Sequence, residues 1–212
     1  CCKQISDFVV ATDDERIFEE VKSNGYPVVM TAVDHQSGTD RIAEVAKSRN
    51  ESWILNIQGD EPFLDPHMID KFLIEFHSKA SNCLVGTIAC PINSLEDHGD
   101  VNVVKVVLRH NQKALYFSRA QIPCDRDKLN SLQHCYRHLG VYLYERDTLL
   151  SFSQLPPSDL EQIEKLEQLR LLQAGYDLYV HIVDEASFGI DTPEDLSNAE
   201  QYFQKIKIKG SK

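Results

Sequence analysis

The chain has 212 residues, which suits one domain with a substantial core better than two full-sized domains. Its formal net charge of -11 argues against a broad nucleic-acid-binding face, although a local basic pocket could still bind phosphates. No apolar run reaches the ~20 residues that a membrane-spanning helix needs, so we expect neither nucleic acid nor a membrane as a partner. A small anionic substrate fits these limits.

Alternating strand and helix patterns organise the first half of the chain. Apolar runs predict strands at 8–13, 26–30, 53–57 and 83–89, and helical patterns occupy 14–22, 41–46 and 66–78. The residues from Ser37 to Asp40 have the form of a capped helix entry. This alternation implies βαβ units, and therefore an α/β fold with a mostly parallel sheet flanked by helices.

The second half of the chain is less regular. Residues 103–108 and 114–117 resemble a hairpin, and 138–144 and 178–183 are typical of strands. The polar segment 122–135 is interpreted as a mobile loop or part of a dimer contact. One helix is predicted from Ser158 to Gly175, and a last one follows 189–195 and reaches about residue 206. We expect a single domain over 1–212, with a small lobe.

The six cysteines form no C-x-x-C pair and no zinc-ligand spacing with the eight histidines. Reduced thiols in a cytoplasmic protein are the simplest interpretation. Residues 1–7 carry neither a signal-peptide pattern nor an initiating methionine, so a processed, truncated or incomplete chain is expected.

The most informative motif is the heptapeptide Asn-Ile-Gln-Gly-Asp-Glu-Pro at 56–62, directly after the strand predicted at 53–57. Ligands collect at the carboxyl ends of parallel strands, and a hard cation there takes oxygens from one or two carboxylates plus substrate phosphates. Asp60 and Asp191 both end strand-like runs at polar turns. If those strands are neighbours, the two acids could hold Mg²⁺ against a nucleotide triphosphate. Helix capping is the competing interpretation of Asp191.

Other polar residues could line the same cleft. Arg119 follows an apolar strand and could grip a carboxylate by two hydrogen bonds, as an acidic sugar would require, or it could be a surface arginine. His138 and Tyr142 are four residues apart, which puts both side chains on one face of a strand. They could share a polar pocket or play a structural role.

Three further sites give weaker signals. Glu167 and Gln168 interrupt a leucine-rich helix and could bind sugar hydroxyls, although solvent exposure explains them equally well. Thr12-Asp13 and Ser37-Gly38-Thr39 could contact a base or ribose, but the same residue types serve as turn and helix-cap residues.

Taken together, these blocks form an ordered set that resembles the 3-deoxy-manno-octulosonate cytidylyltransferase (CMP-KDO synthetase) family. The matching blocks are VATDDERI (10–17), DHQSGTDRIAEV (34–45), NIQGDEP (56–62), VKVV (104–107), ALYFSRAQIP (114–123), RHLGVYLY (137–144), LEQLR (166–170) and GIDTPEDL (189–196). The resemblance covers nearly the whole chain, and the order and spacing of the blocks make it specific.

The resemblance implies a nucleotidyltransferase-type α/β domain with a small dimerisation or substrate lobe. It also implies a cytoplasmic homodimer that uses Mg²⁺ to couple CTP to the acidic sugar KDO, for lipopolysaccharide synthesis. On this basis Asp60 and Asp191 would be metal ligands and catalytic, together with Arg119. The sugar-facing residues would be Gln58, Arg119, His138, Tyr142, Glu167 and Gln168, and the nucleotide side would include Thr12, Asp13, Ser37, Gly38 and Arg41.

One departure from the family pattern limits this prediction. Members of the family open with a first strand and a basic, glycine-containing loop that grips the triphosphate, and nothing similar precedes Phe8. We therefore expect an exposed sheet edge or a gap in the core. Two alternatives stay open: a cytidylyltransferase for another sugar acid such as sialic acid, and a non-catalytic member that binds a partner or only dimerises.

Overall fold

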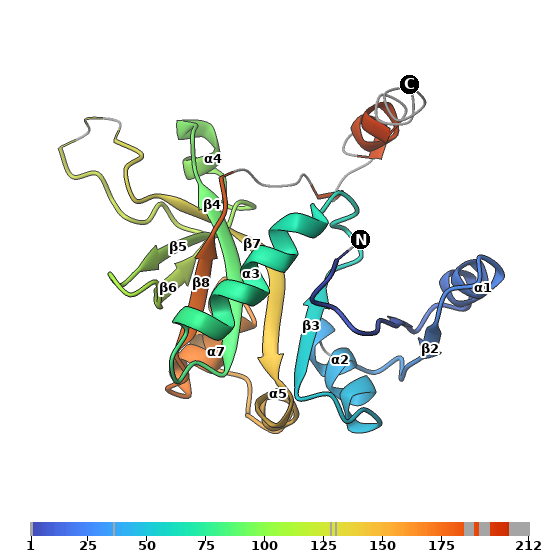
Figure 1. Cartoon of the computed structure of the whole chain (residues 1–212). Helices are drawn as coiled ribbons and strands as arrows, with labels where there is room; N and C mark the ends of the chain where they lie inside the picture. Colours follow the sequence, from blue (N-terminus) through green and yellow to red (C-terminus); the bar gives the residue numbers. More distant parts are fainter. Residues whose placement is uncertain are drawn as a thin grey trace.

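The computed structural model describes residues 2–35, 37–127, 129, 131–184, 189–190 and 196–203, which fold into two sheets with flanking helices (Figure 1). The strands are β1 (Val10–Thr12), β2 (Val28–Met30), β3 (Trp53–Ile57), β4 (Val85–Pro91), β5 (Lys105–Leu108), β6 (Ala114–Ser118), β7 (Tyr136–Glu145) and β8 (Leu178–Ile182). The helices are α1 (Glu15–Ser23), α2 (Gly38–Lys47), α3 (Pro66–Lys79), α4 (Leu95–Gly99), α5 (Arg146–Phe152), α6 (Asp159–Glu164) and α7 (Gln168–Gln173), and residues 196–203 are also helical. The α/β class predicted from the sequence is confirmed.

The pairing within the larger sheet differs from the expected mostly parallel arrangement. β4 pairs with β8 in parallel, but β7 pairs antiparallel with β3, β4 and β5, and β5 pairs antiparallel with β6. β3, β4, β5 and β8 therefore point the same way, and β7 runs against them. The apolar pattern of β7 predicted a strand correctly, but such a pattern carries no information about strand direction.

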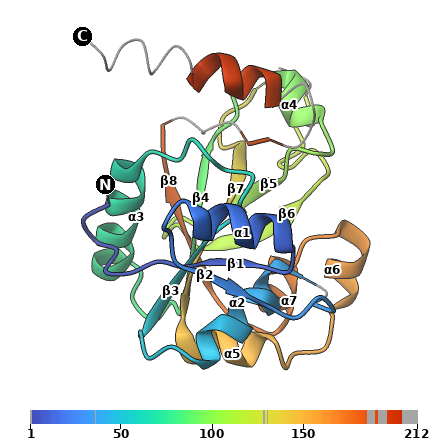
Figure 2. The same cartoon turned by 90° about the vertical axis from the view of Figure 1, so that its right-hand side faces the viewer.

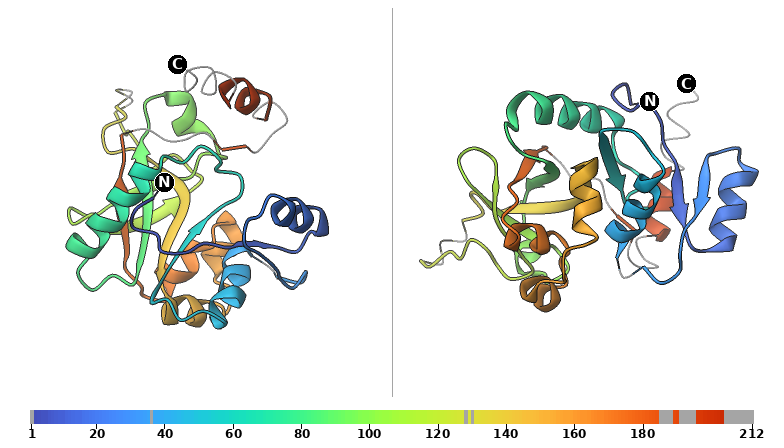
Figure 3. Two further views of the ribbon diagram at one scale, coloured as in Figure 1. Left: turned by 45° about the vertical axis from the view of Figure 1, so that its right-hand side comes forward. Right: turned by 90° about the horizontal axis from the view of Figure 1, so that it is seen from below.

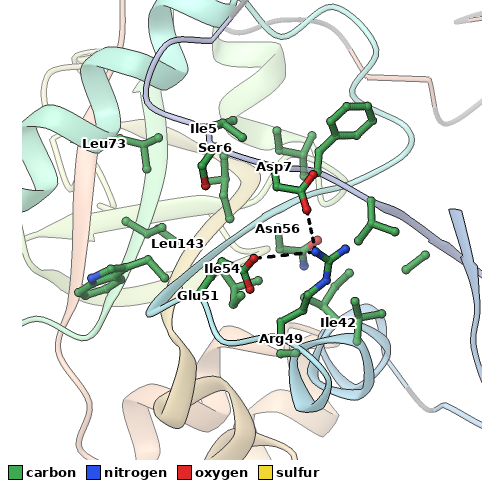
Figure 4. Close-up of a pocket in the computed structure, with 18 of the residues that line it drawn as sticks. Ile5, Ser6, Asp7, Ile42, Arg49, Glu51, Ile54, Asn56, Leu73 and Leu143 are labelled. Atoms are coloured by element: carbon green, nitrogen blue, oxygen red, sulfur yellow. Dashed lines mark hydrogen bonds and ion pairs between the residues drawn. The ribbon is translucent and has the colours of Figure 1, made fainter. Parts of the chain in front are cut away.

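β1 and β2 form a separate parallel pair that carries α1 (Figures 1 and 2). Both views in Figure 3 also place this unit beside β3 and α2 and away from the rest of the larger sheet. A cavity of about 510 Å³ lies between residues 4–11, α2, β3 and α3. Its walls include Ile5, Ile42 and Ile54, and at one end Arg49 forms ion pairs with Asp7 and Glu51 (Figure 4).

The alternation of side chains along β7 separates two hydrophobic cores. Leu139, Val141 and Leu143 pack with α3 on one face, where Gly86 of β4 leaves room for the ring of Phe76. A Cβ at Gly86 would lie 2.6 Å from that ring, so only glycine permits this contact. Tyr142 and Tyr144 belong to the opposite core, which is built from α2, α5 and α7. His138 and Tyr142, two of the predicted site residues, lie on this second face.

The helix predicted from Ser158 to Gly175 is two helices in the structure. The backbone turns at Lys165, which adopts a left-handed φ of 55° between α6 and α7. A capping box starts α6, because Ser158 and Glu161 each bond the other's backbone N–H. The helical spacing of the leucines continues across the break, so a prediction from periodicity alone gave one helix where the structure has two. The short helices α4 and α5 were also missed.

Within the described part of the chain, no helix is both long and apolar enough to cross a lipid bilayer.

Candidate active site

The start of α2 forms one side of the candidate site. Ser37 caps this helix as predicted, because its hydroxyl accepts a hydrogen bond from the backbone N–H of Asp40 at 3.2 Å. The Arg41 guanidinium lies 2.7 Å from the carboxylate of Asp13, at the end of β1, and also donates to the hydroxyl of Thr31. The backbone carbonyl of Thr12 accepts from Thr31 at 2.9 Å.

These contacts bring together the residues assigned to the nucleotide side. A Cβ built on Gly38 meets no atom within 4 Å among the described residues, so the start of α2 borders open space. The charge of Arg41 is engaged by Asp13, which indicates that Arg41 holds the turn after β1 against α2. A role in direct nucleotide contact stays a prediction.

His138 and Tyr142 lie on the same face of β7, as their spacing predicted, with ring centroids 5.3 Å apart. The ring of Phe117, in β6, packs edge-on against His138 at 4.9 Å. Gln58 follows β3 and lies over Gly140, since a Cβ there would be 3.4 Å from the Gln58 Cγ. Gln58 therefore sits beside the strand segment between the two rings.

Burial lowers the pKa of His138 to about 3, so its imidazole is neutral near pH 7. Its Nε2 lies 2.8 Å from the Thr87 hydroxyl oxygen, which in turn lies 2.7 Å from the carbonyl oxygen of Val141. The single hydroxyl proton goes to that carbonyl, so the hydroxyl oxygen accepts from Nε2–H. This network assigns the proton to Nε2 and leaves Nδ1 as an acceptor.

The start of α7 joins the two sides of the site. Burial raises the pKa of Tyr142 well above its usual value, and the charges of Tyr144 and Glu167 add to this rise. Tyr144 stacks on Tyr142, with ring centroids 5.7 Å apart. Gln168 is buried in α7, with 4% of its surface exposed. Residues of α2 and α7, among them Ala43 and Leu169, pack in the same core as Tyr142 and Tyr144 of β7.

Arg119 does not project freely into a cleft. Its Nε donates to the carbonyl of Glu164 at 2.8 Å, and its Nη1 donates to the carbonyl of Val101 at 3.0 Å. A longer contact of 3.4 Å joins Nη2 to the carbonyl of Lys165. The sequence placed Arg119 correctly after an apolar strand, but it gave no sign that backbone oxygens hold the guanidinium.

Asp60 is exposed in the turn after β3, and its carbonyl accepts a hydrogen bond from Ile190 at 2.8 Å. The predicted partner Asp191 lies outside the described residues. The strands that precede the two acids in the chain, β3 and β8, are not neighbours, because β7 and β4 lie between them. The segment after β8 instead returns to Asp60 at Gly189 and Ile190. Among the described residues, no group of three acidic, His or Cys side chains forms a metal cluster.

Sequence reasoning missed three polar residues that hold the site. Thr87 fixes the tautomer of His138, and Glu164 contacts Arg119. Lys105 is fully buried, and its ammonium donates to the carbonyls of Asp100, Val103 and Arg119 at 2.6 to 2.7 Å. A lysine within the apolar run 103–108 was the one visible signal, since a buried charge needs partners.

Residues 1–182 match the family described as Cytidylyltransferase. The structure is similar to one of "CMP:2-keto-3-deoxy-manno-octonic acid synthetase complexed with CTP", with a TM-score of 0.89, 36% identity, and coverage of 96% of this chain and 83% of the other. A putative glucose-1-phosphate thymidylyltransferase from Bacillus anthracis shares the fold, with a TM-score of 0.62 at 15% identity over 93% of this chain and 76% of the other. The family match and the similarity to the CTP-complexed synthetase therefore define an enzyme of the nucleotidyltransferase class.

Relatives found by sequence show which family of nucleotidyltransferases the chain belongs to. A protein of Solibacter usitatus named 3-deoxy-manno-octulosonate cytidylyltransferase is 46% identical, over 95% of this chain and 79% of that protein. A protein of Geobacter metallireducens with the same name is 43% identical, over 96% of this chain and 84% of that protein. The chain belongs to the 3-deoxy-manno-octulosonate cytidylyltransferase family.

Proposed function

We propose that this protein transfers the cytidylyl group of CTP to KDO, giving CMP-KDO and pyrophosphate, and so activates KDO for lipopolysaccharide synthesis. The observation that carries the proposal is the 43–46% identity to the two relatives named above, over about 95% of the chain. The geometry agrees with a two-substrate site, because α2 and α7 pack over the face of β7 that carries His138 and Tyr142.

The anomeric hydroxyl oxygen of KDO forms a bond to the α-phosphorus of CTP. The bond from that phosphorus to the oxygen bridging it to the β-phosphate breaks, pyrophosphate leaves with the electron pair, and the hydroxyl proton passes to solvent. Binding and alignment supply much of the acceleration in such a transfer, because the two substrates must meet in one orientation.

The sugar acid has hydroxyl groups and one carboxylate to be recognised. Neutral His138 offers an Nδ1 acceptor, and Gln58 and Tyr142 lie beside it on the same face. Glu167 and Gln168 are proposed to contact sugar hydroxyls from the start of α7. Arg119 is proposed to bind the carboxylate by charge-assisted hydrogen bonds.

Thr12, Asp13, Ser37, Gly38 and Arg41 are proposed to form the cytidine side. Their support is the cluster of contacts that joins the end of β1 to the start of α2 beside the open space at Gly38. The base and ribose of CTP would bind at the turn after β1, which the ion pair between Arg41 and Asp13 holds in place.

Mg²⁺ is proposed as the cofactor, with Asp60 and Asp191 as its ligands. Mg²⁺ needs only one or two protein carboxylates when substrate phosphates supply other oxygens, and the exposed carboxylate of Asp60 at the carboxyl end of β3 fits that requirement. When bound, Mg²⁺ would neutralise charge on the phosphate oxygens. Asp60 holds the segment that leads to Asp191 through the bond from Ile190 to its carbonyl.

We further propose a cytoplasmic homodimer in which the chain acts as one domain. Light scattering would measure the oligomeric state.

Pyrophosphate release in the presence of CTP, KDO and Mg²⁺, with CMP-KDO identified by mass, tests the function. Release that requires all three supports the proposal. A protein that binds neither substrate would favour the non-catalytic alternative.

A further inference from the structure

We propose that Glu164 is a positioning residue that orients Arg119 for the carboxylate of the sugar acid and leaves the charge of Arg119 unpaired. This inference rests on the proposed function, in which Arg119 binds that carboxylate. Glu164 is the last residue of α6, and Arg119 directly follows β6, 45 positions earlier in the chain. A tertiary contact therefore sets the direction of the arginine.

The Glu164 carboxylate holds the backbone on both sides of the Ser118–Arg119 peptide. One oxygen accepts from the Ser118 hydroxyl at 2.6 Å, and the other accepts from the Arg119 backbone N–H at 2.9 Å. The Ser118 hydroxyl oxygen also accepts from the N–H of Ala120 at 3.0 Å. Ser118 is 2% exposed, so these bonds form where water competes little.

The backbone carbonyl of Glu164 fixes the arginine side chain itself. It accepts from Arg119 Nε at 2.8 Å, and the carbonyls of Val101 and Lys165 accept from Nη1 and Nη2. A guanidinium has five N–H donors in a fixed plane. Three are used in this way, so one remains on each terminal nitrogen, the number that a two-point contact with a carboxylate requires.

Glu164 contacts Arg119 without neutralising it. Within the part of the chain that the structure describes, no carboxylate forms an ion pair with the Arg119 guanidinium, although Arg41 and Arg170 each have one. A backbone carbonyl directs a guanidinium as well as a carboxylate does, but it leaves the full positive charge for a ligand. The Glu164 carboxylate accepts from the backbone N–H of Arg119, and the Glu164 carbonyl accepts from the Nε of Arg119.

Lys105 supports the same arrangement from the other side. Its ammonium donates to the carbonyl of Arg119 at 2.6 Å and to those of Asp100 and Val103, which flank the carbonyl of Val101 that Arg119 contacts. Val104, which follows Val103 in the chain, accepts a hydrogen bond at its backbone carbonyl from the backbone N–H of His138 at 2.8 Å. We call the contacts of Glu164 and Lys105 with Arg119 the clamp. The clamp is therefore connected, through Val104, to β7, the strand that carries His138.

The test compares Glu164→Ala and Glu164→Gln with the wild-type protein, and Asp159→Asn is the matched control. Asp159 is an exposed acid of the same helix, so the control removes one negative charge and leaves the clamp intact. Pyrophosphate release at varied KDO and varied CTP gives separate KM values, and hydrogen exchange reports the Arg119 amide directly.

Glu164→Ala should raise the KM for KDO by about tenfold with the KM for CTP nearly unchanged, because misplacement of the arginine affects only one substrate. Its Arg119 amide should exchange at least about tenfold faster. Glu164→Gln keeps one acceptor oxygen in the same shape and should fall between wild type and Glu164→Ala, while Asp159→Asn should match the wild type.

An unchanged KM for KDO and an unchanged Arg119 amide in either folded variant would overturn the inference. Equal increases in both KM values would also overturn it, since they indicate a general structural loss. Absence of turnover in the wild type would instead reject the proposed function and the substrate role of the clamp, and amide exchange would still decide whether Glu164 holds Arg119.

Discussion

The imidazole of His138, which is half-buried between Phe117 and Tyr142, makes a quantitative prediction about stability and pH. Burial lowers its pKa from 6.5 to about 3, so the folded protein favours the neutral ring, whereas the unfolded chain takes up a proton below pH 6.5. The unfolded state then binds more protons, and stability must fall as the pH drops from 6.5 toward 3. Replacing His138 by Gln, which also presents an N–H donor, should remove this contribution.

The expected size follows from proton linkage. At pH 5 the unfolded histidine is 1.5 units below its pKa and the folded one is still neutral, so the difference amounts to about 2 kcal/mol. Between pH 7 and pH 5, the wild type should therefore lose about 2 kcal/mol more of its free energy of unfolding than His138→Gln. His181, whose pKa burial also lowers, is present in both proteins and cancels in the comparison.

Urea unfolding at pH 7 and pH 5 measures this difference, and the comparison of slopes is insensitive to any constant destabilisation by the substitution. A titration of the His138 ring followed by NMR gives its pKa independently. Equal pH dependence in the two proteins, or a folded-state pKa near 6.5, would refute the assignment of a neutral His138 ring on this face of β7.

Two further substitutions test the support of the site and the metal proposal. Glu161→Gln breaks the buried bidentate pair with Arg170, whose contacts are 2.7 and 2.5 Å. It should cost about 3 kcal/mol, or roughly 6–12 °C in melting temperature for a chain of this size. Glu19→Gln, which removes an exposed pair in α1, should shift it by less than about 2 °C, and similar shifts in both would contradict the burial argument. Asp60→Asn should abolish Mg²⁺-dependent turnover without changing the melting temperature, while the exposed Asp97→Asn should leave turnover intact. Near-normal turnover in Asp60→Asn would reject Asp60 as a ligand.

Local signals in the sequence predicted the elements that local forces determine. The strand at 53–57 and the Ser37 cap of α2 were both found, because apolar patterning and side-chain capping act over a few residues. His138 and Tyr142 share a face, as their spacing predicted, although the pairing of β4 with β7 shifts register between Thr87 and Ile88.

The features that the sequence did not predict depend on distant contacts. The break at Lys165 follows a helix held by the Glu161–Arg170 pair, and leucine spacing continues through it. The direction of β7 depends on which strands it joins. The carbonyls around Arg119 come from residues 101, 164 and 165. These residues are far from Arg119 in the sequence, so no local pattern predicts the contacts.

The central claim is that this site couples CTP to KDO in preference to another sugar acid. The most direct measurement is pyrophosphate release with CTP and Mg²⁺ when KDO and sialic acid compete at equal concentration. We expect release that depends on KDO, with CMP-KDO as the product and little effect of sialic acid. Turnover of sialic acid alone, with KDO inert, would contradict it.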